Sequence, residues 1–491
     1  MEWSQFEAEL RVCDTTEEAI GCLKKGQAMF FAESTSTSNL TDTEKLTLSQ
    51  STGSRNELIF SVPAASKNQF YMNYTKYISL LLNSVAVKWL GELDNDTRKR
   101  FFFSVFIYGP VTDTFLGILA CLKGSGHSKV IGTCLTVMEQ FIGVGRLQQL
   151  IVEQCRTRTS VQLESLASYV CNLSAVLESK LVLGPCHAFV QDNYQLMLAK
   201  DIMRALERLQ HHTSPQYSFA GKLLGKLSMM GDKEMVTRCV LEYVQRSHDN
   251  AVQISDVLCT IPSTCLEGFA LPFLICDYIS FDELKHYINV VFGSKLVLIG
   301  KLCTIFYHRF LFVRYFRSVR PMYLLFYPLT ASEERRYLLT KSLLELLTIW
   351  GNKSSVEQQP YEQHVAICQC AVVCYYYMSQ EEIEAIKDRL MLLLTAGMPV
   401  HLDSNNTRLR YIGMATAEII TSKINLGTDK ALKFEYADNE DTLLLKSLME
   451  GVPEEKLEEA PAPVYTDPEP ESLGKFFFFK NITFILTFFL C

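Results

Sequence analysis

Glycine and proline are scarce in this sequence of 491 residues. The chain has 24 glycines and 15 prolines, whereas average usage is about 7% and about 5%. Sustained alternation of apolar and polar residues, which half-buried strands require, is also almost missing. These absences disfavour collagen-like, loop-rich and strand-and-turn architectures.

An excess of basic residues is missing as well. Lysine and arginine number 47 against 54 aspartates and glutamates, which gives a net charge of −7. A chain with this balance has no general affinity for polyanions. With 48% apolar and 21% charged residues, it has the composition of a globular protein with ample material for a core.

The local motifs of common enzymes do not occur. The sequence has no Gly-x-Ser-x-Gly elbow, no His-Glu-x-x-His and no set of kinase signatures. Two stretches with glycine and lysine, residues 123–129 and 221–228, miss the spacing of a phosphate-binding loop. We predict turns or helix ends at both, and we expect no enzyme activity and no cofactor.

One cluster has the residue types of a metal site: His364, Cys368, Cys370 and Cys374. On a helix, residues two positions apart point about 200° away from each other, so Cys368 and Cys370 cannot reach the same ion. The surrounding residues are apolar. The sequence therefore predicts a buried helix here, without a metal.

Cysteine serves elsewhere as a small apolar residue. Most of the sixteen cysteines lie inside apolar runs, and the acidic residues 1–7 contain no core of a signal peptide. This usage is typical of a reduced compartment. We expect the protein in the cytoplasm or the nucleus.

Apolar residues recur at helical spacing along most of the chain. Asp232 stands where an N-cap belongs. Ser280, Thr330 and Ser379 each precede a glutamate by three residues, which is the spacing of a capping box. Helices are predicted to follow each of these residues.

The clearest pair of helices is predicted at 380–396 and 406–424, with Gly397 and Pro399 ending the first. The stretch between Asp403 and Arg410 resembles the HEAT-repeat pattern. In that pattern an aspartate in the turn binds backbone amides, and an arginine of the next helix reaches the turn before it. We predict an all-α fold, an irregular HEAT-like helical-repeat solenoid.

The composition changes along the chain and predicts five segments. They are an N-terminal helical segment (1–32), a flexible loop rich in serine and threonine (33–57), the α-solenoid (58–450), a disordered acidic and proline-rich linker (451–474), and an aberrant apolar tail (475–491).

The tail has two interpretations. A membrane anchor needs about 18–20 apolar residues, and the uninterrupted run after Lys480 has only 11. The residues at 474–476 are those that a splice-donor sequence encodes, and polyphenylalanine is what a T-rich intron encodes. We favour a retained intron or a gene-model error over an anchor, and we expect no membrane partner.

A helix with the pattern Arg-x-x-Gly-Met is followed by a Leu-Lys-Phe segment. Weaker likenesses lie upstream, at residues 89–90, 106–110 and 115–116. Together these stretches resemble the telomere length regulation protein family, of the Tel-two/Clk-two type, over about residues 1–450. The motif residues are Arg410, Gly413, Met414, Glu418, Leu432, Lys433 and Phe434.

The resemblance implies a non-enzymatic α-solenoid scaffold. The family forms the Triple-T complex with two other helical-repeat subunits and serves as an adaptor for a heat-shock chaperone and its loading complex. Its clients are phosphatidylinositol 3-kinase-related kinases, including mTOR and the DNA-damage kinases, which it helps to mature. The resemblance also implies a cytoplasmic location, with nuclear and telomeric sites in addition.

Two departures from the family pattern stand out. The family's acidic linker carries an Asp-Ser-Asp-Asp-like phosphorylation site, and nothing in residues 437–474 matches it. Thr466, which acidic residues follow, is a candidate phosphosite, although we favour the interpretation as a solvated linker without modification. The family's carboxy-terminal solenoid is also absent, so we expect a form truncated at its linker.

Residues 307–320 interleave cations with aromatic side chains. Arg309, Arg314, Arg317 and Arg320 could form a patch for an anionic partner, which makes a telomeric nucleic-acid-binding protein the alternative function. The other interpretation is a solenoid helix whose arginines extend along its apolar face. We favour the latter and expect no nucleic acid among the partners.

Overall fold

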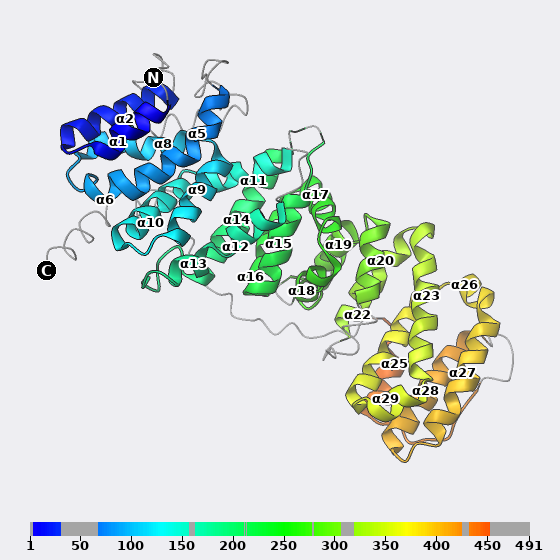
Figure 1. Ribbon diagram of the computed structural model, residues 1–491. Helices are drawn as coiled ribbons and strands as arrows, with labels where there is room; N and C mark the ends of the chain where they lie inside the picture. Colours follow the sequence, from blue (N-terminus) through cyan, green and yellow to red (C-terminus); the bar gives the residue numbers. More distant parts are fainter. Residues whose placement is uncertain are drawn as a thin grey trace. The chain divides into compact units, whose positions relative to one another are not determined.

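The structure is a computed structural model that describes residues 3–30, 67–156, 163–210, 212, 214–276, 279–305, 319–424 and 432–451. In these residues every regular element is a helix (Figure 1). The predicted all-α helical-repeat fold is therefore confirmed. The described residues divide into two compact units, with the boundary between Gln216 and Tyr217.

The first unit is built from helices that pack on helices close to them in the sequence: α9 packs against the next helix, α10, and α11 packs against α14, beyond two short helices. Its elements include two π-helical turns, η1 and η2. They are α1 (Trp3–Val12), α2 (Thr16–Phe30), α5 (Lys67–Leu80), η1 (Leu81–Val85), α6 (Ala86–Lys88), α7 (Asn95–Thr97), η2 (Arg98–Phe103), α8 (Ser104–Tyr108), α9 (Val111–Gly124), α10 (Ser128–Gly143), α11 (Arg146–Arg156), α12 (Leu163–Cys171), α13 (Leu173–Glu178) and α14 (Gln191–Leu209).

A buried tyrosine joins three helices of this unit. The Tyr74 hydroxyl on α5 donates to the Val105 carbonyl of α8 at 2.8 Å and lies 2.8 Å from the Thr114 hydroxyl of α9. Gly109 leaves room for it, because a Cβ at that position would overlap the tyrosine ring. Buried hydroxyls need such partners, so this network fixes how α5 lies on α8 and α9.

The second unit continues the same design with longer helices. Its elements are α15 (Ser218–Met230), α16 (Lys233–Arg246), α17 (His248–Cys259), α18 (Ser263–Leu274), α19 (Phe281–Val291), α20 (Leu296–Ile305), α22 (Arg320–Phe326), the 3-10 helix η4 (Tyr327–Ala331), α23 (Glu333–Trp350), α24 (Lys353–Gln358), α25 (Tyr361–Tyr376), α26 (Gln380–Ala385), α27 (Lys387–Leu402), α28 (Thr407–Ile424) and α29 (Glu440–Ser447).

Three of the four predicted N-caps are confirmed. Asp232 accepts hydrogen bonds from the amides of residues 234 and 235, and Ser280 accepts one from residue 283. Ser379 forms a complete capping box with Glu382. Thr330 is not a cap: it lies in η4, and α23 begins after Ser332. Because residues 327–331 form η4, the cap and the start of α23 lie two residues later than predicted.

The predicted helix end at Gly397 and Pro399 is wrong, because α27 continues through both residues to Leu402. Gly397 has a packing role instead. A Cβ there would lie 2.5 Å from Cζ3 of Trp350 and 2.8 Å from the Cα of Gly351. The glycine thus allows α27 to approach the end of α23. From the sequence alone, a glycine that allows close packing looks the same as a glycine that ends a helix.

The details expected of a HEAT turn are also different. Asn406, not Asp403, accepts hydrogen bonds from the amides of residues 408 and 409. The Arg410 guanidinium donates to the Thr407 hydroxyl at 3.2 Å, one turn back on its own helix. The general prediction of a helix pair remains correct, since α27 packs against α28.

Of the two glycine–lysine stretches, only one is a turn. Residues 123–129 join α9 to α10, as predicted. Residues 221–228 lie inside α15, so the prediction of a turn or helix end there is wrong. Its glycines allow close packing, because a Cβ at Gly225 would lie 3.1 Å from that of Cys265 on α18.

No single helix among the described residues is long and apolar enough to cross a membrane, although three sharply bent helix pairs reach that length and composition together. The predicted loop 33–57, the linker beyond Gly451 and the tail 475–491 lie outside the described residues.

Candidate functional site

The two parts of the family-type motif meet at the Glu418 carboxylate. One of its oxygens accepts a hydrogen bond from the Phe434 amide at 2.5 Å, and the other accepts one from the Tyr436 hydroxyl at 2.8 Å. Burial and the nearby carboxylate raise the pKa of Tyr436, so it stays a donor. Glu418 therefore fastens the residues that follow α28 to α28 itself.

Residues 432–451, which we call the strap, are held at further points. Asp441 accepts hydrogen bonds from the Arg408 guanidinium at 2.8 Å and from the Tyr361 hydroxyl at 2.6 Å. The Tyr323 hydroxyl donates to the Leu448 carbonyl at 2.6 Å. Figure 1 shows α29, the helix of the strap, beside α25 and α28. The strap thus links α22, α25 and α28.

Sequence reasoning missed these attachments of the strap. Their partners are separated by 33 to 125 residues, which no local pattern reveals. One local signal was available: Asn439 and Thr442 form a capping box at the start of α29. It marks a helix where the solenoid was predicted to end.

The remaining motif residues are packed in the core, bonded within α28 or exposed at the start of the strap. Met414 is buried, and the hydrogen bond from Arg410 to Thr407 lies within α28, as described above. Leu432 and Lys433 are exposed at the start of the strap. Gly413 lies against the ring of His401, which a Cβ at position 413 would overlap.

His401 forms a buried pair with His364. Their Nε2 atoms are 3.0 Å apart, and Nδ1 of His401 lies 3.0 Å from the Gly397 carbonyl. A carbonyl only accepts, so Nδ1 of His401 carries the proton and its Nε2 must accept from His364 when both rings are neutral. The Trp350 ring stacks on His401 with centroids 4.3 Å apart.

The environment keeps both histidines neutral. Burial, together with the second imidazole, lowers the pKa of His364 to about 3. Burial lowers the pKa of His401 to about 4, although its bond to the Gly397 carbonyl acts in the opposite direction. The hydrogen-bonded pair thus joins α25 to α27 inside the core of the second unit.

The cysteine-rich stretch is the buried helix that the sequence predicted. Cys368, Cys370 and Cys374 are fully buried on α25. Burial raises the pKa of Cys368 to about 12 and also raises the pKa values of Cys370 and Cys374 well above their usual range, so these thiols are not nucleophiles at neutral pH. In the part of the chain that the structure describes, no three His, Cys, Asp or Glu side chains converge to hold a metal.

Of the four arginines predicted to form a patch for an anionic partner, Arg320 alone lies within the described residues. Arg309, Arg314 and Arg317 lie outside the described residues. The Arg320 guanidinium, at the start of α22, donates to the Ile279 carbonyl at 2.8 Å and lies 5.5 Å from the centre of the Phe281 ring. These contacts are within the protein. The candidate phosphosite Thr466 also lies outside the described residues.

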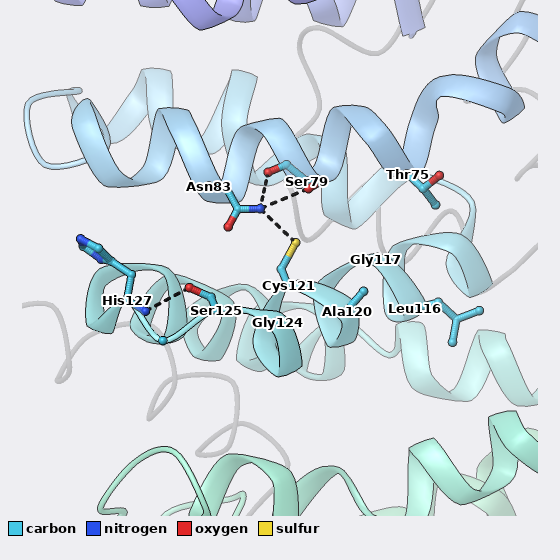
Figure 2. A pocket seen from close by; sticks show the side chains of 11 residues that line it. Thr75, Ser79, Asn83, Leu116, Gly117, Ala120, Cys121, Gly124, Ser125 and His127 are labelled. Atoms are coloured by element: carbon cyan, nitrogen blue, oxygen red, sulfur yellow. Dashed lines mark hydrogen bonds between the residues drawn. The ribbon is translucent and has the colours of Figure 1, made fainter.

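A groove of about 720 Å³ lies in the first unit between α5 with η1 and α9 (Figure 2). Asn83 donates to the Ser79 carbonyl at 2.9 Å and approaches Sγ of Cys121 at 3.7 Å. Burial raises the pKa of Cys121. The described lining residues include no carboxylate, lysine or arginine, so the groove has no acid–base pair and no activated nucleophile.

Comparison with known proteins relates this architecture to one family. Residues 281–443 match the family model of the TELO2 ARM repeat domain. The match includes the histidine pair and the contact between Glu418 and the strap.

Several curated relatives carry the name "Telomere length regulation protein TEL2 homolog". The chain is 26% identical to the Xenopus laevis protein over 418 residues, which are 82% of this chain and 49% of that protein. It is 25% identical to the Mus musculus protein over 411 residues, covering 81% and 49%. The chain spans about half the length of the curated relatives it matches.

Proposed function

Because the chain is a TELO2-family protein of the helical-repeat scaffold type, we propose that it acts as a non-enzymatic adaptor of the Triple-T complex. In this role it helps a heat-shock chaperone system to mature and stabilise phosphatidylinositol 3-kinase-related kinases, among them mTOR and the DNA-damage kinases. The names of the relatives refer only to telomere length regulation. We propose that this process depends on such kinases.

The observation that carries the proposal is the way in which the family-type motif is used. Its residues secure the ends and contacts of helices in the second unit, with Glu418 holding the strap and Gly413 admitting His401. A motif that fixes how the helices pack also fixes the shape of the surface that these helices form. This is what a scaffold needs, because a helical-repeat protein binds its partners along extended surfaces.

The chemistry of the buried groups favours the same role. The described cysteines on α25 and the paired histidines are held neutral in the core. The proposed partners are therefore proteins: the other Triple-T subunits, the kinases, and the chaperone with its loading complex. The proposed location is cytoplasmic, with nuclear and telomeric pools in addition.

Affinity purification tests the proposal. The tagged chain and a tagged full-length relative are expressed separately in cells that contain the kinases, and each purification is probed for the kinases and for the Triple-T subunits. We expect the chain to recover the kinases. If the full-length relative recovers them and the chain recovers none, this chain does not act as the proposed adaptor.

A matched pair of variants makes that experiment specific. Glu418→Ala releases the strap, whereas Glu435→Ala removes an exposed carboxylate from the same segment. We expect recovery to fall with the first variant and to be unchanged with the second. Equal recovery with both would contradict a role for the motif in shaping the binding surface.

A further inference from the structure

The helix α27 exposes an apolar face. Leu392 is 68% exposed, and Ala396 and Pro399 on the same side are exposed as well, whereas Leu390 and Leu394 on the other side are buried. Met391 and Leu402, which are 41% and 42% exposed, lie about a quarter of a turn away from Leu392. Figure 1 shows α27 at the edge of the second unit, where α28 and α23 cover its other face. Exposed apolar surface that polar residues border marks an interaction site, so this side of α27 indicates an interface.

The charges on this face have a self-complementary arrangement. Arg389 and Asp403 each lie seven residues from Ala396, one before it and one after it, and all three are exposed. Seven residues are nearly two helical turns, so the three positions share one side of α27. Neither charged side chain forms an ion pair within the described residues.

We propose that α27 pairs antiparallel with α27 of a second copy of this chain, about a two-fold axis at Ala396. In that register Arg389 of one copy lies at the level of Asp403 of the other, and symmetry forms the ion pair twice. Leu392 of each copy packs near Pro399 of the other. The small side chain of Ala396 lets the two helices approach closely at the axis.

A second copy explains this face better than an unrelated helix does. Two-fold symmetric interfaces use the same patch on both partners, so each charge must find its opposite on that patch. Arg389 and Asp403 meet this condition at equal distances from the small central residue. A single helix buries an area at the low end of specific interfaces, so we expect a dimer that dissociates in the micromolar range.

Sedimentation velocity of the whole chain over about 1 to 100 µM tests the proposal. The wild type should shift from monomer to dimer. Leu392→Glu should abolish the shift, whereas Leu443→Glu should leave it unchanged, because Leu443 is also exposed (56%) but lies on α29. A wild type that stays monomeric at the highest concentration would overturn the proposal, as would a dimer that is unaffected by Leu392→Glu.

Charge exchange tests the register. Arg389→Asp and Asp403→Arg should each weaken the dimer about tenfold, because each places like charges together twice, and the double variant should restore it. Failure of the double variant to restore the dimer would mean that the face receives another partner, such as an amphipathic helix. Dimerisation is independent of the proposed function, so either can fail alone.

A disulfide test places the axis. Ala396→Cys, in a background with Cys186→Ser and Cys491→Ser, should form a disulfide-linked dimer on mild oxidation, because the two β-carbons meet at the axis. Leu443→Cys in the same background should remain monomeric. Cross-linking by the second variant and not by the first would contradict the antiparallel pairing.

Discussion

His364 and His401 share a hydrogen bond between their Nε2 atoms, 3.0 Å apart, at a place where neither ring is more than 1% exposed. The bond from Nδ1 of His401 to the Gly397 carbonyl sets the tautomer of the pair. A proton added to either ring would place a charge in the core without a carboxylate to balance it. Acid stability of the second unit therefore depends on this pair.

We predict that the second unit loses stability as the pH falls below 6.5. The histidine pKa values are about 3 and about 4 in the folded protein and near 6.5 in the unfolded chain. The unfolded state therefore binds protons first, so stability is full above pH 6.5 and declines toward pH 4. At pH 5 each histidine should contribute about 2 kcal/mol of destabilisation.

Urea unfolding at a series of pH values measures this effect. The variant His364→Leu should show about half the loss between pH 7 and pH 5, because only one buried histidine remains to titrate. The variant His286→Gln, at an exposed position on α19, serves as the control. A wild type with equal stability at pH 7 and pH 5 would contradict a buried neutral pair.

Replacing Gly413 tests the packing of α28 on His401. Gly413→Ala should destabilise the protein by about 2 kcal/mol, because the new Cβ overlaps a ring held by Trp350, His364 and the Gly397 carbonyl. Gly300→Ala is the matched control on α20, where a Cβ meets nothing within 4 Å. It should stabilise by about 0.5–1 kcal/mol. Thermal denaturation of both variants measures the difference, and stabilisation by both would refute the close approach.

Replacing Glu418 tests the attachment of the strap. Glu418→Ala leaves the Phe434 amide and the Tyr436 hydroxyl without their acceptor, and should cost about 2 kcal/mol. Amide hydrogen exchange should become faster in residues 432–436, with little change in α15 to α18. Unchanged exchange in the strap would show that Glu418 does not hold it.

Arginine substitution tests the alternative of nucleic-acid binding. Because Arg320 is engaged with Ile279 and Phe281, we expect no binding of single-stranded telomeric DNA at physiological salt. The triple variant of Arg309, Arg314 and Arg317 to alanine should leave this result unchanged in fluorescence anisotropy. Affinity that falls steeply between about 50 and 200 mM salt in the wild type, and is lost in the variant, would favour the alternative.

Features that depend on neighbours in sequence were predictable from the sequence. The caps at Asp232 and Ser379 follow from side chains that bind amides two or three residues away, and the buried helix around Cys368 follows from apolar neighbours on every side. The motif also pointed to Glu418, although its partners in the strap were not assigned.

Features that depend on distant residues were not predictable. Gly397 looks like a stop signal until Trp350, 47 positions earlier, is known to pack against it. His401 was overlooked because its partner lies 37 residues away. Glycine and histidine are used in turns and on surfaces as often as in close packing, so local context cannot decide between these roles.

Binding between purified components shows whether this chain is a scaffold for phosphatidylinositol 3-kinase-related kinases. Isothermal titration of the chain with the helical-repeat region of such a kinase measures the affinity without other proteins. We expect saturable binding that Glu418→Ala weakens and Glu435→Ala does not. Absence of heat and of co-migration at tens of micromolar, with both proteins folded, would contradict it.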